Sequence, residues 1–437
     1  MRYKKFILLV LFLGLAPFYS ECKLAENKMD IKPLNTNISK KSAVKESKSV
    51  DQVYQSYLDY FEQVYKYMDE NYYHAVSREA YNDFVQKFNT KIYAQFKDTG
   101  KSVDFIKWRS AALLVDHLKT QEDVFSALYP PKPAEEFVKS ATGKRNDLGI
   151  EGHKIAEGYS VDKVEPRSDS YVKGLRPQDL ILAFNSQNVG DLDDVKIKDF
   201  LNPLENAEVA IDYLAAVDKH KKQIKVKSQE YIKQTVFAFD TGVPNVYGIK
   251  LETFNRMTSE DMLRYMEFFR QQGSIEGLIL DLRNNPGGPP LAAREISAFF
   301  LPGGDQFAYF HKKGLEEAKL DVPVIPEQFK YHGPMVIWVN KDSGSASELF
   351  SGILQRKGRA ILMGSNSAGQ VMLKSMFDMD DKAMLLLITS RGYHSDGTPF
   401  SFGGLIPDQR TATESEILQA SLNYIRYMDM KNSGKIK

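Results

Sequence analysis

Two stretches in the second half of the chain share one pattern, a buried strand that ends in a turn and continues into a helix. In the first, an apolar run rich in β-branched residues at 334–340 precedes a turn of small residues at 341–348 and a helical pattern at 349–358. In the second, the apolar run 277–282 ends in a polar, glycine-bearing turn at 283–288 before a helical run at 291–300. Strands and helices alternate through the rest of residues 231–437, which predicts an α/β core with a mixed sheet.

The first of these turns contains several serines. A serine between a strand and a helix is placed where a nucleophile would sit, because small neighbours admit a substrate backbone and the free N–H groups of the helix amino terminus face a developing negative charge. A serine-rich helix cap without any chemistry explains the turn by itself equally well. The residues of this stretch leave both interpretations open.

Taken together, the two stretches resemble the C-terminal processing peptidases, also called tail-specific proteases, a family of exported serine peptidases. The resemblance rests on LILDLRNNPGG at 278–288 and SGSASE at 343–348. It extends to GRAILMG at 358–364 and GLIPD at 404–408. It implies a helical amino-terminal cap, a small β-rich PDZ-like domain and an α/β mixed-sheet catalytic core.

The resemblance also implies roles for individual residues. Ser345 matches the family's nucleophile, and the N–H of Ala346 matches one oxyanion donor. The second donor falls in the turn at 286–288, on Gly287 or Gly288. Acyl transfer to a serine needs a nucleophile, oxyanion donors and a base, so two of the three parts are expected in this chain.

The residue at the position expected for the general base differs from the family pattern. The family's lysine follows the nucleophile by about twenty-five positions, and Gln370 stands there in this chain. A glutamine amide does not take up a proton at a useful pH. The aspartate that the family carries in the helix after the serine is also absent, since residues 355–360 read QRKGRA.

Other side chains are candidates for the base. Lys374 lies about 13 Å from Gln370 if the strand between them is fully extended, which is too far without a shift in register. Related peptidases use a histidine from the amino-terminal cap as the base, and His117 is the candidate because it lies in the expected cap. The family's cap motif aligns better with residues 122–126, however, and there Phe125 stands in place of the histidine. His394 lies on a turn that resembles a family motif. Surface or structural imidazoles explain both histidines without chemistry.

The amino terminus has the pattern of an export signal. Residues 1–5 are basic and residues 6–18 form an apolar segment too short to anchor a mature protein in a bilayer. Cys22, the single cysteine, follows shortly after this segment, which favours a lipoprotein signal. The three residues before Cys22 form a poor lipidation site, which favours a simple secretion signal, so both alternatives stand for residues 1–22. Residues 23–50 are polar and predict a disordered tether. The expected location is therefore exported: periplasmic, envelope-anchored through a lipidated Cys22, or secreted.

Three folded units are expected after the tether. Residues 51–145 have the spacing of a helical cap, and residues 146–228 change to short β-type runs that resemble a PDZ domain. Such domains add a peptide to a sheet edge and capture its carboxylate with backbone N–H groups, here from Leu148, Gly149 and Ile150. A small β domain that only positions its neighbours is the alternative. Residues 229–437 form the expected peptidase core.

Composition narrows the function further. A net charge of +1 gives no nucleic-acid signature, and the seven histidines show no metal-ligand spacing, so we expect protein or peptide partners and neither a metal nor a cofactor. Two hypotheses follow. The chain is an exported serine peptidase that cleaves extended or C-terminal segments of proteins captured by its PDZ domain, or it is a catalytically inactive homologue that binds peptides in the cell envelope. The intact turns at 286–288 and 343–348 favour the peptidase, and Gln370 favours the inactive homologue.

Overall fold

The computed structural model describes residues 50–93, 101–142, 144–311 and 318–434. The expected export signal and all but the last residue of the expected tether lie outside these ranges. Within them, no helix combines the length and the apolar character needed to cross a bilayer.

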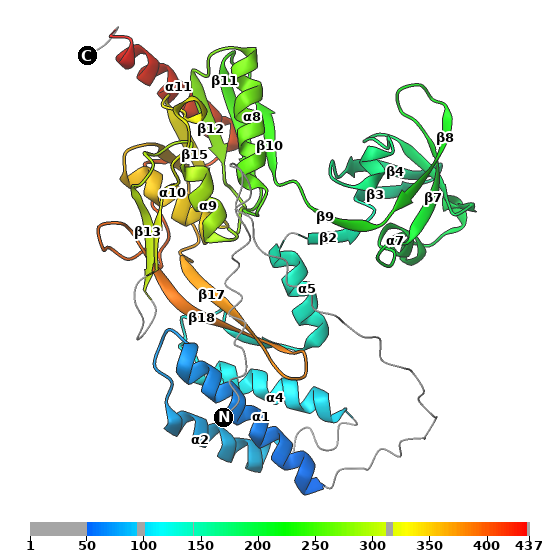
Figure 1. Cartoon of the computed structure of the whole chain (residues 1–437), viewed down its shortest axis with the longest axis vertical. Helices are drawn as coiled ribbons and strands as arrows, with labels where there is room; N and C mark the ends of the chain where they lie inside the picture. The colour runs from blue at the N-terminus through cyan, green and yellow to red at the C-terminus, as the bar shows by residue number, and fades with distance from the viewer. Residues whose placement is uncertain (1–49, 94–100, 143, 312–317, 435–437) are drawn as a thin grey trace, which may run out of the picture.

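A six-stranded sheet forms the centre of the carboxyl-terminal half, in the order β10-β11-β12-β15-β16-β19 (Figure 1). β10 is antiparallel to β11, and the other neighbours are parallel. The strands span Val236–Asp240 (β10), Val246–Leu251 (β11), Gly277–Asp281 (β12), Met335–Val339 (β15), Ile361–Gly364 (β16) and Gln409–Arg410 (β19). Because β12 and β15 are parallel neighbours, the turns that follow them meet at one edge of the sheet.

Helices cover both faces of this sheet. β12 buries Leu278 and Leu280 on one face and Ile279 on the other, as the alternation of side chains along a strand requires. Three helices contribute to the first core, α8 (Thr258–Gln272), α9 (Pro290–Ser297) and α10 (Ala346–Arg356). The closing helix α11 (Glu414–Asn432) packs on the second face, and it begins at the capping box that its N-cap Thr413 forms with Glu416.

A second sheet joins the core to the amino-terminal cap. Its order is β1-β18-β13-β14, with β17 paired to β18. The strands span Ala127–Tyr129 (β1), Gln306–His311 (β13), Ala318–Asp321 (β14), Met372–Asp378 (β17) and Met384–Tyr393 (β18). The cap was expected to be helical, but its strand β1 continues a sheet of the core, so the two units share backbone hydrogen bonds.

The cap helices pack on the β17–β18 pair, as Figure 1 shows at its lower end. These elements are α1 (Val50–Asn71), α2 (Arg78–Lys87), the π-helix η1 (Phe88–Ile92) and α4 (Val103–Leu118), while α5 (Pro131–Thr142) leads away from the cap. Their aromatic side chains form one buried core with Leu385, Leu387 and Ile388 of β18. Asp381, in the β17–β18 turn, accepts hydrogen bonds from Trp108 Nε1 at 2.8 Å and Tyr60 Oη at 3.3 Å, and pairs with Lys107 Nζ at 2.7 Å.

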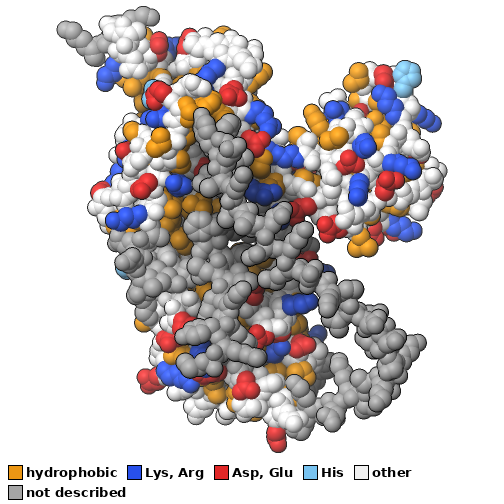
Figure 2. Space-filling view, in the orientation of Figure 1, with side chains coloured by type: hydrophobic (Ala, Val, Ile, Leu, Met, Phe, Trp, Pro, Cys, Tyr) orange, Lys and Arg blue, Asp and Glu red, His pale blue; other side chains and the backbone are white. Residues whose placement is uncertain are grey.

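A small β module stands to one side of the molecule (Figure 1). The chain enters it through β2 (Lys144–Asp147) and leaves through β9 (Gln229–Ile232), which pair with each other. Its sheet has the order β3-β4-β5-β7-β8, with β6 paired to β5. The elements are β3 (Ile150–Ile155), β4 (Gly158–Val164), α6 (Asp169–Val172), β5 (Leu180–Phe184), β6 (Gln187–Asn188), η2 (Val189–Asp191), α7 (Asp194–Leu201), β7 (Glu208–Leu214) and β8 (Lys221–Lys227). Figure 2 shows acidic and basic side chains interspersed over the visible face of this module.

The expected fold class is confirmed. The chain is a multidomain α/β protein with amino-terminal helices, a separate β-rich module and a mixed-sheet core.

Candidate active site

Ser345 lies at the junction of β15 and α10 in a rarely populated backbone conformation. Its φ is 53° and its ψ is −115°, a combination that costs a residue with a Cβ of the order of 1–3 kcal/mol. The turn before it is fixed by Ser343 Oγ, which accepts from Asn340 N at 2.9 Å and donates to Leu282 O at 2.8 Å. Ser345 itself is half-buried, and the hydrogen bonds of Ser343 hold the turn in which it lies.

The turn after β12 lies directly against Ser345. Asn285 is fully buried, and its carbonyl accepts from Gly344 N and Ser347 Oγ, each at 2.9 Å. A Cβ added to Gly287 would lie 2.7 Å from Ser345 Cβ and 2.8 Å from Ala346 N. The two hydrogen bonds that the Asn285 carbonyl accepts thus hold the glycine turn and the serine turn together.

The two turns also offer free backbone donors. Gly287 N–H donates to Asn285 Oδ1 at 2.8 Å, so it is not available as an oxyanion donor. The Gly287 carbonyl accepts from Thr253 Oγ1 at 2.7 Å and Phe254 N at 2.8 Å, and the trans peptide therefore directs the Gly288 N–H to the opposite side. Within the described ranges, neither Gly288 N–H nor Ala346 N–H has an acceptor. Of the two glycines predicted as the second donor, Gly288 is the one with a free N–H.

Glu348, in the first turn of α10, joins the serine turn to the segment that carries Gln370. Its carboxylate is buried and accepts from Ser345 N at 3.0 Å. It also accepts, each at 2.6 Å, from Ser367 Oγ, Gly369 N and Gln370 N. In the sequence, Glu348 stood only as the last residue of a motif. Its place three residues after Ser345, in the first turn of a helix, was the signal for this role.

Gln370 points toward the serine turn. Its Oε1 lies 3.5 Å from the ideal Cβ position on Gly344, the residue before Ser345. The side chain at the position where a base was expected therefore lies beside the candidate nucleophile, but it is an amide. Within the described part of the chain, no hydrogen bond joins Ser345 Oγ to a titratable side chain.

The chain between Gln370 and Lys374 is not one fully extended strand. Met372 N donates to Gln370 O at 2.9 Å, which makes residues 370–372 a tight turn, and the pairing of β17 with β18 shifts register between Leu373 and Lys374. The estimate of about 13 Å assumed a fully extended chain, and the turn departs from that assumption. Lys374 Nζ lies 3.7 Å from the ring centroid of Phe125, and burial lowers the pKa of its ammonium group.

The two candidate histidines have other partners. His117 Nε2 lies 3.3 Å from Asp83 Oδ2 within the cap, and its ring packs on Phe84. His394 is buried and stacks on Phe400 with ring centroids 3.8 Å apart. Burial in this apolar setting lowers the pKa of His394 to about 4. Neither imidazole forms a hydrogen bond with Ser345.

Chain geometry sets His394 apart from the serine turn. His394 stacks on Phe400, and the Phe400 ring packs against Gly352 of α10, where an added Cβ would lie 2.9 Å from it. Gly352 is seven residues after Ser345, which is about 10 Å along a helix at 1.5 Å per residue. The structure thus brings together Ser345, Ala346, Gly287, Gly288 and Gln370, and it does not bring either histidine to them.

The predicted peptide-binding loop lies in the β module, where β2 ends and β3 begins. Leu148 N donates to Leu201 O at 3.0 Å, and Gly149 N donates to Asp147 Oδ1 at 2.7 Å. Two of the three N–H groups expected to capture a terminal carboxylate are therefore already used within the module.

Residues 245–411 match the family model described as Peptidase family S41. The carboxyl-terminal-processing protease of Synechocystis sp. is 25% identical over 303 residues, which cover 67% of this chain and 68% of the relative. The chloroplastic carboxyl-terminal-processing peptidase 3 of Arabidopsis thaliana is 24% identical over 345 residues, covering 73% of this chain and 64% of the relative.

Among solved structures, the tricorn protease aligns with a TM-score of 0.52 at 14% identity, over 86% of this chain and 37% of that chain. The photosystem II D1 C-terminal processing protease aligns with a TM-score of 0.47 at 17% identity, over 86% of this chain and 97% of that chain. The first of these supports the fold.

The chain therefore contains a peptidase domain of family S41. Within that class, its relatives are carboxyl-terminal processing proteases, which is the family that the sequence motifs had indicated.

Proposed function

We propose that this protein is an exported serine-type peptidase of the C-terminal processing type, which cleaves extended or C-terminal segments of proteins captured by its PDZ-like module. One observation carries the proposal: Ser345 is held at a strained turn against Gly287, beside the free N–H groups of Ala346 and Gly288. A serine that served only as a helix cap would need neither the strain nor the glycine contact.

In this proposal, Ser345 Oγ attacks the substrate carbonyl and the two N–H groups stabilise the oxyanion of the tetrahedral intermediate. Glu348 positions the serine by accepting its backbone N–H, and it does not itself react. The serine proton must pass to a base other than Gln370. His117 and His394 were the candidates from the sequence, but both lie away from Ser345 and would need a rearrangement to reach it. Lys374, whose pKa is lowered by burial, is a further group to test for that role.

Export is a further part of the proposal. It is supported by the basic and apolar pattern of residues 1–22, with Cys22 as the candidate lipid attachment site. The expected divisions are the cap at 51–145, the PDZ-like module at 146–228 and the peptidase core at 229–437.

The second candidate function is a peptide-binding protein without catalysis. It is favoured by Gln370, which occupies the position beside the serine turn where a base would act. Under this hypothesis the PDZ-like module holds a peptide, and Ser345 has no chemical role.

Labelling with a fluorophosphonate probe separates the two functions. A nucleophilic Ser345 is labelled, and Ser345→Ala abolishes the label. Ser351→Ala is the matched control, because Ser351 lies on the same helix, is fully buried and has no partner for its Oγ. Labelling that persists in Ser345→Ala, or no labelling between pH 6 and 9, would reject the peptidase and support the binding protein.

A further inference from the structure

The loop that precedes β3 contains its own carboxylate. Asp147 Oδ1 accepts the N–H of Gly149 at 2.7 Å and also accepts a hydrogen bond from the Tyr231 hydroxyl. Loops of this kind capture a ligand's terminal carboxylate with successive backbone N–H groups. In this chain one of those groups already binds a carboxylate that belongs to the protein.

The loop is fixed in this arrangement from both sides. Leu148 N donates to Leu201 O at the end of α7, and the Leu148 carbonyl accepts from the buried Ser170 Oγ at 2.5 Å. Gly149 has a φ of 68°, and a Cβ there would lie 2.3 Å from Ser168 Cβ. The close packing leaves little room for the loop to turn its N–H groups elsewhere.

A cavity of about 340 Å³ opens at this loop, between the module and the β2–β9 pair. Asp147, Ile150, Leu201 and Tyr231 line it, and so does Glu165, which is 4% exposed and has one carboxylate oxygen without a partner. A ligand's carboxylate at the loop would therefore meet two acidic groups.

Basic side chains also line the cavity, namely Arg145, Lys163 and Lys233. Lys233 is paired with Glu151 at 3.2 Å, and Lys163 lies 4.6 Å from the centre of the Phe237 ring. The lining thus holds three basic side chains and three acidic ones, Asp147, Glu151 and Glu165. Of these six, Asp147 is the one that hydrogen-bonds the N–H of the loop.

The strand that follows the loop is open along one side. β3 is the edge strand of the module's sheet and pairs only with β4. Glu165 N donates to Gly149 O, and antiparallel pairs alternate, so the next pair directs the N–H and carbonyl of Ile150 to the open edge. An extended segment can add to this edge through its backbone without offering a terminus.

We propose that Asp147 determines the specificity of capture: its carboxylate occupies the place of a ligand's terminal carboxylate, so the module takes an internal segment of a protein by strand addition to β3 rather than a free C-terminus. This inference rests on the capture role in the proposed function and specifies its substrate class. The cleavage site is then selected by an extended stretch within the substrate chain.

The test compares peptides that differ only at their ends. A random decapeptide pool is synthesised once with free carboxylates and once as C-terminal amides, which resemble an internal segment. Both pools are offered together to the full chain carrying Ser345→Ala, so that nothing is cleaved, and the bound peptides are quantified by mass spectrometry. Loss of the peptidase activity alone would leave this binding result unchanged.

With Asp147 present, the acid and amide pools should be enriched to within about twofold of each other, because the loop adds no net hydrogen bond to a carboxylate. Asp147→Ala should raise the acid-to-amide ratio about tenfold, since it frees the Gly149 N–H and removes a like charge. Asp147→Asn, which keeps the shape of the loop, should raise the ratio by about threefold through the charge alone.

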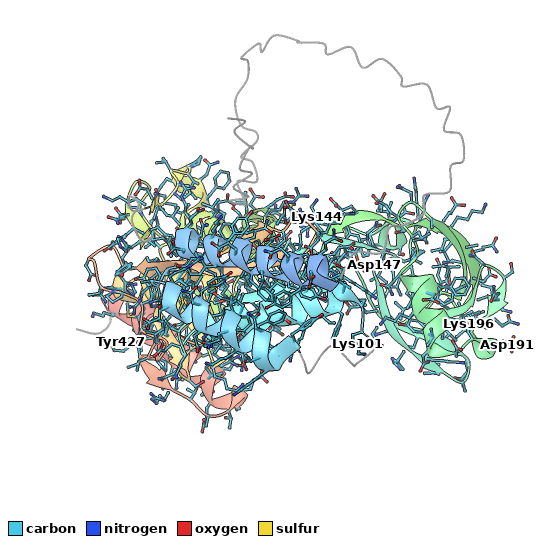
Figure 3. The ribbon with its side chains drawn as sticks, turned by 90° about the horizontal axis from the view of Figure 1, so that it is seen from below. Lys101, Lys144, Asp147, Asp191, Lys196 and Tyr427 are labelled. Atoms are coloured by element: carbon cyan, nitrogen blue, oxygen red, sulfur yellow. The ribbon has the colours of Figure 1, made fainter. Side chains whose placement is uncertain are left out.

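Asp191→Asn is the matched control, because it makes the same change on the same module at a site far from Asp147 (Figure 3). It should leave the ratio unchanged. Preferential enrichment of the acid pool with Asp147 in place would overturn the inference. A ratio that responds to neither substitution at Asp147, or no enrichment from either pool, would overturn it as well.

Discussion

A Cβ on Gly287 would lie 2.7 Å from the Cβ of Ser345, although the two residues belong to different strand–turn–helix units. β12 and β15 are parallel neighbours, so the turns after them are forced to one edge of the sheet. The short distance between Gly287 and Ser345 therefore follows from the order of the strands in the sheet. The same order places the turns that contain the candidate oxyanion donors, the N–H groups of Ala346 and Gly288.

Gly287→Ala should inactivate the site and destabilise the core. The new methyl group would overlap Ser345 Cβ and Gly344 O, and the residue has a φ of 104° that disfavours any side chain. Together these effects should cost about 2–4 kcal/mol of unfolding free energy. Urea unfolding and fluorophosphonate labelling measure the two effects. Gly190→Ala, where a Cβ meets nothing within 4 Å, is the control, and equal stability of the two variants would contradict the prediction.

Gln370→Lys should introduce a base beside Ser345. The Gln370 side chain already reaches Gly344, and partial burial there would favour the neutral amine of a lysine. We expect the labelling rate of Ser345 to rise by about 10²-fold or more, the usual contribution of a positioned base. Gln419→Lys, on the exposed face of α11, adds the same charge without contacting the site. An unchanged rate in Gln370→Lys would mean that the missing lysine is not the defect.

Glu348→Gln should loosen the serine turn. The carboxylate accepts from four donors, and an amide can accept with only one of its two terminal atoms. Leaving buried donors unpaired should lower the unfolding free energy by about 3 kcal/mol and reduce labelling of Ser345. Glu267→Gln, on the exposed face of α8, should change neither measurement. Retention of wild-type stability in Glu348→Gln would refute the role of this network.

His394 should make stability depend on pH between about 6.5 and 4. Burial lowers its pKa from 6.5 to about 4 in the folded protein, so the unfolded chain binds more protons in this window and stability falls as the pH falls. The loss should reach about 2 kcal/mol at pH 5, at 1.36 kcal/mol per pKa unit.

His394→Phe should reduce that pH dependence, because a phenyl ring preserves the stacking on Phe400 and does not titrate. Urea unfolding of both proteins at pH 7.5 and pH 5 provides the comparison. His332→Phe, at an exposed imidazole paired with Glu327, is the control. The prediction fails if wild type and His394→Phe lose the same stability between the two pH values.

Much of the core could be predicted from local patterns. The apolar runs predicted at 277–282 and 334–340 contain the strands β12 and β15, and the helical runs predicted at 291–300 and 349–358 overlap α9 and α10. These elements have strong apolar periodicity and clear end signals, which depend on nearby residues alone.

The parts that could not be predicted depend on contacts between distant segments. β1 joins a sheet of the core because its three residues pair with β18, more than 250 positions later. The turn at 370–372 stands where the sequence predicted an extended chain between Gln370 and Lys374. Asp147 occupies the predicted carboxylate loop through its hydrogen bonds to Gly149 N–H and the distant Tyr231 hydroxyl, and no sequence pattern reports that pairing.

The pairing of β2 with β9 has a consequence for how such a protein changes during evolution. The chain crosses into the small module and returns through adjacent strands, with Arg145 opposite Tyr231, so the two crossing points are neighbours in space. A single insertion or excision of DNA there would replace or remove the small module and leave the remaining chain continuous. The cap has no such freedom, because its removal would expose the apolar face of β18 to water. The module can therefore diverge separately from the core and the cap, which are bound to evolve together.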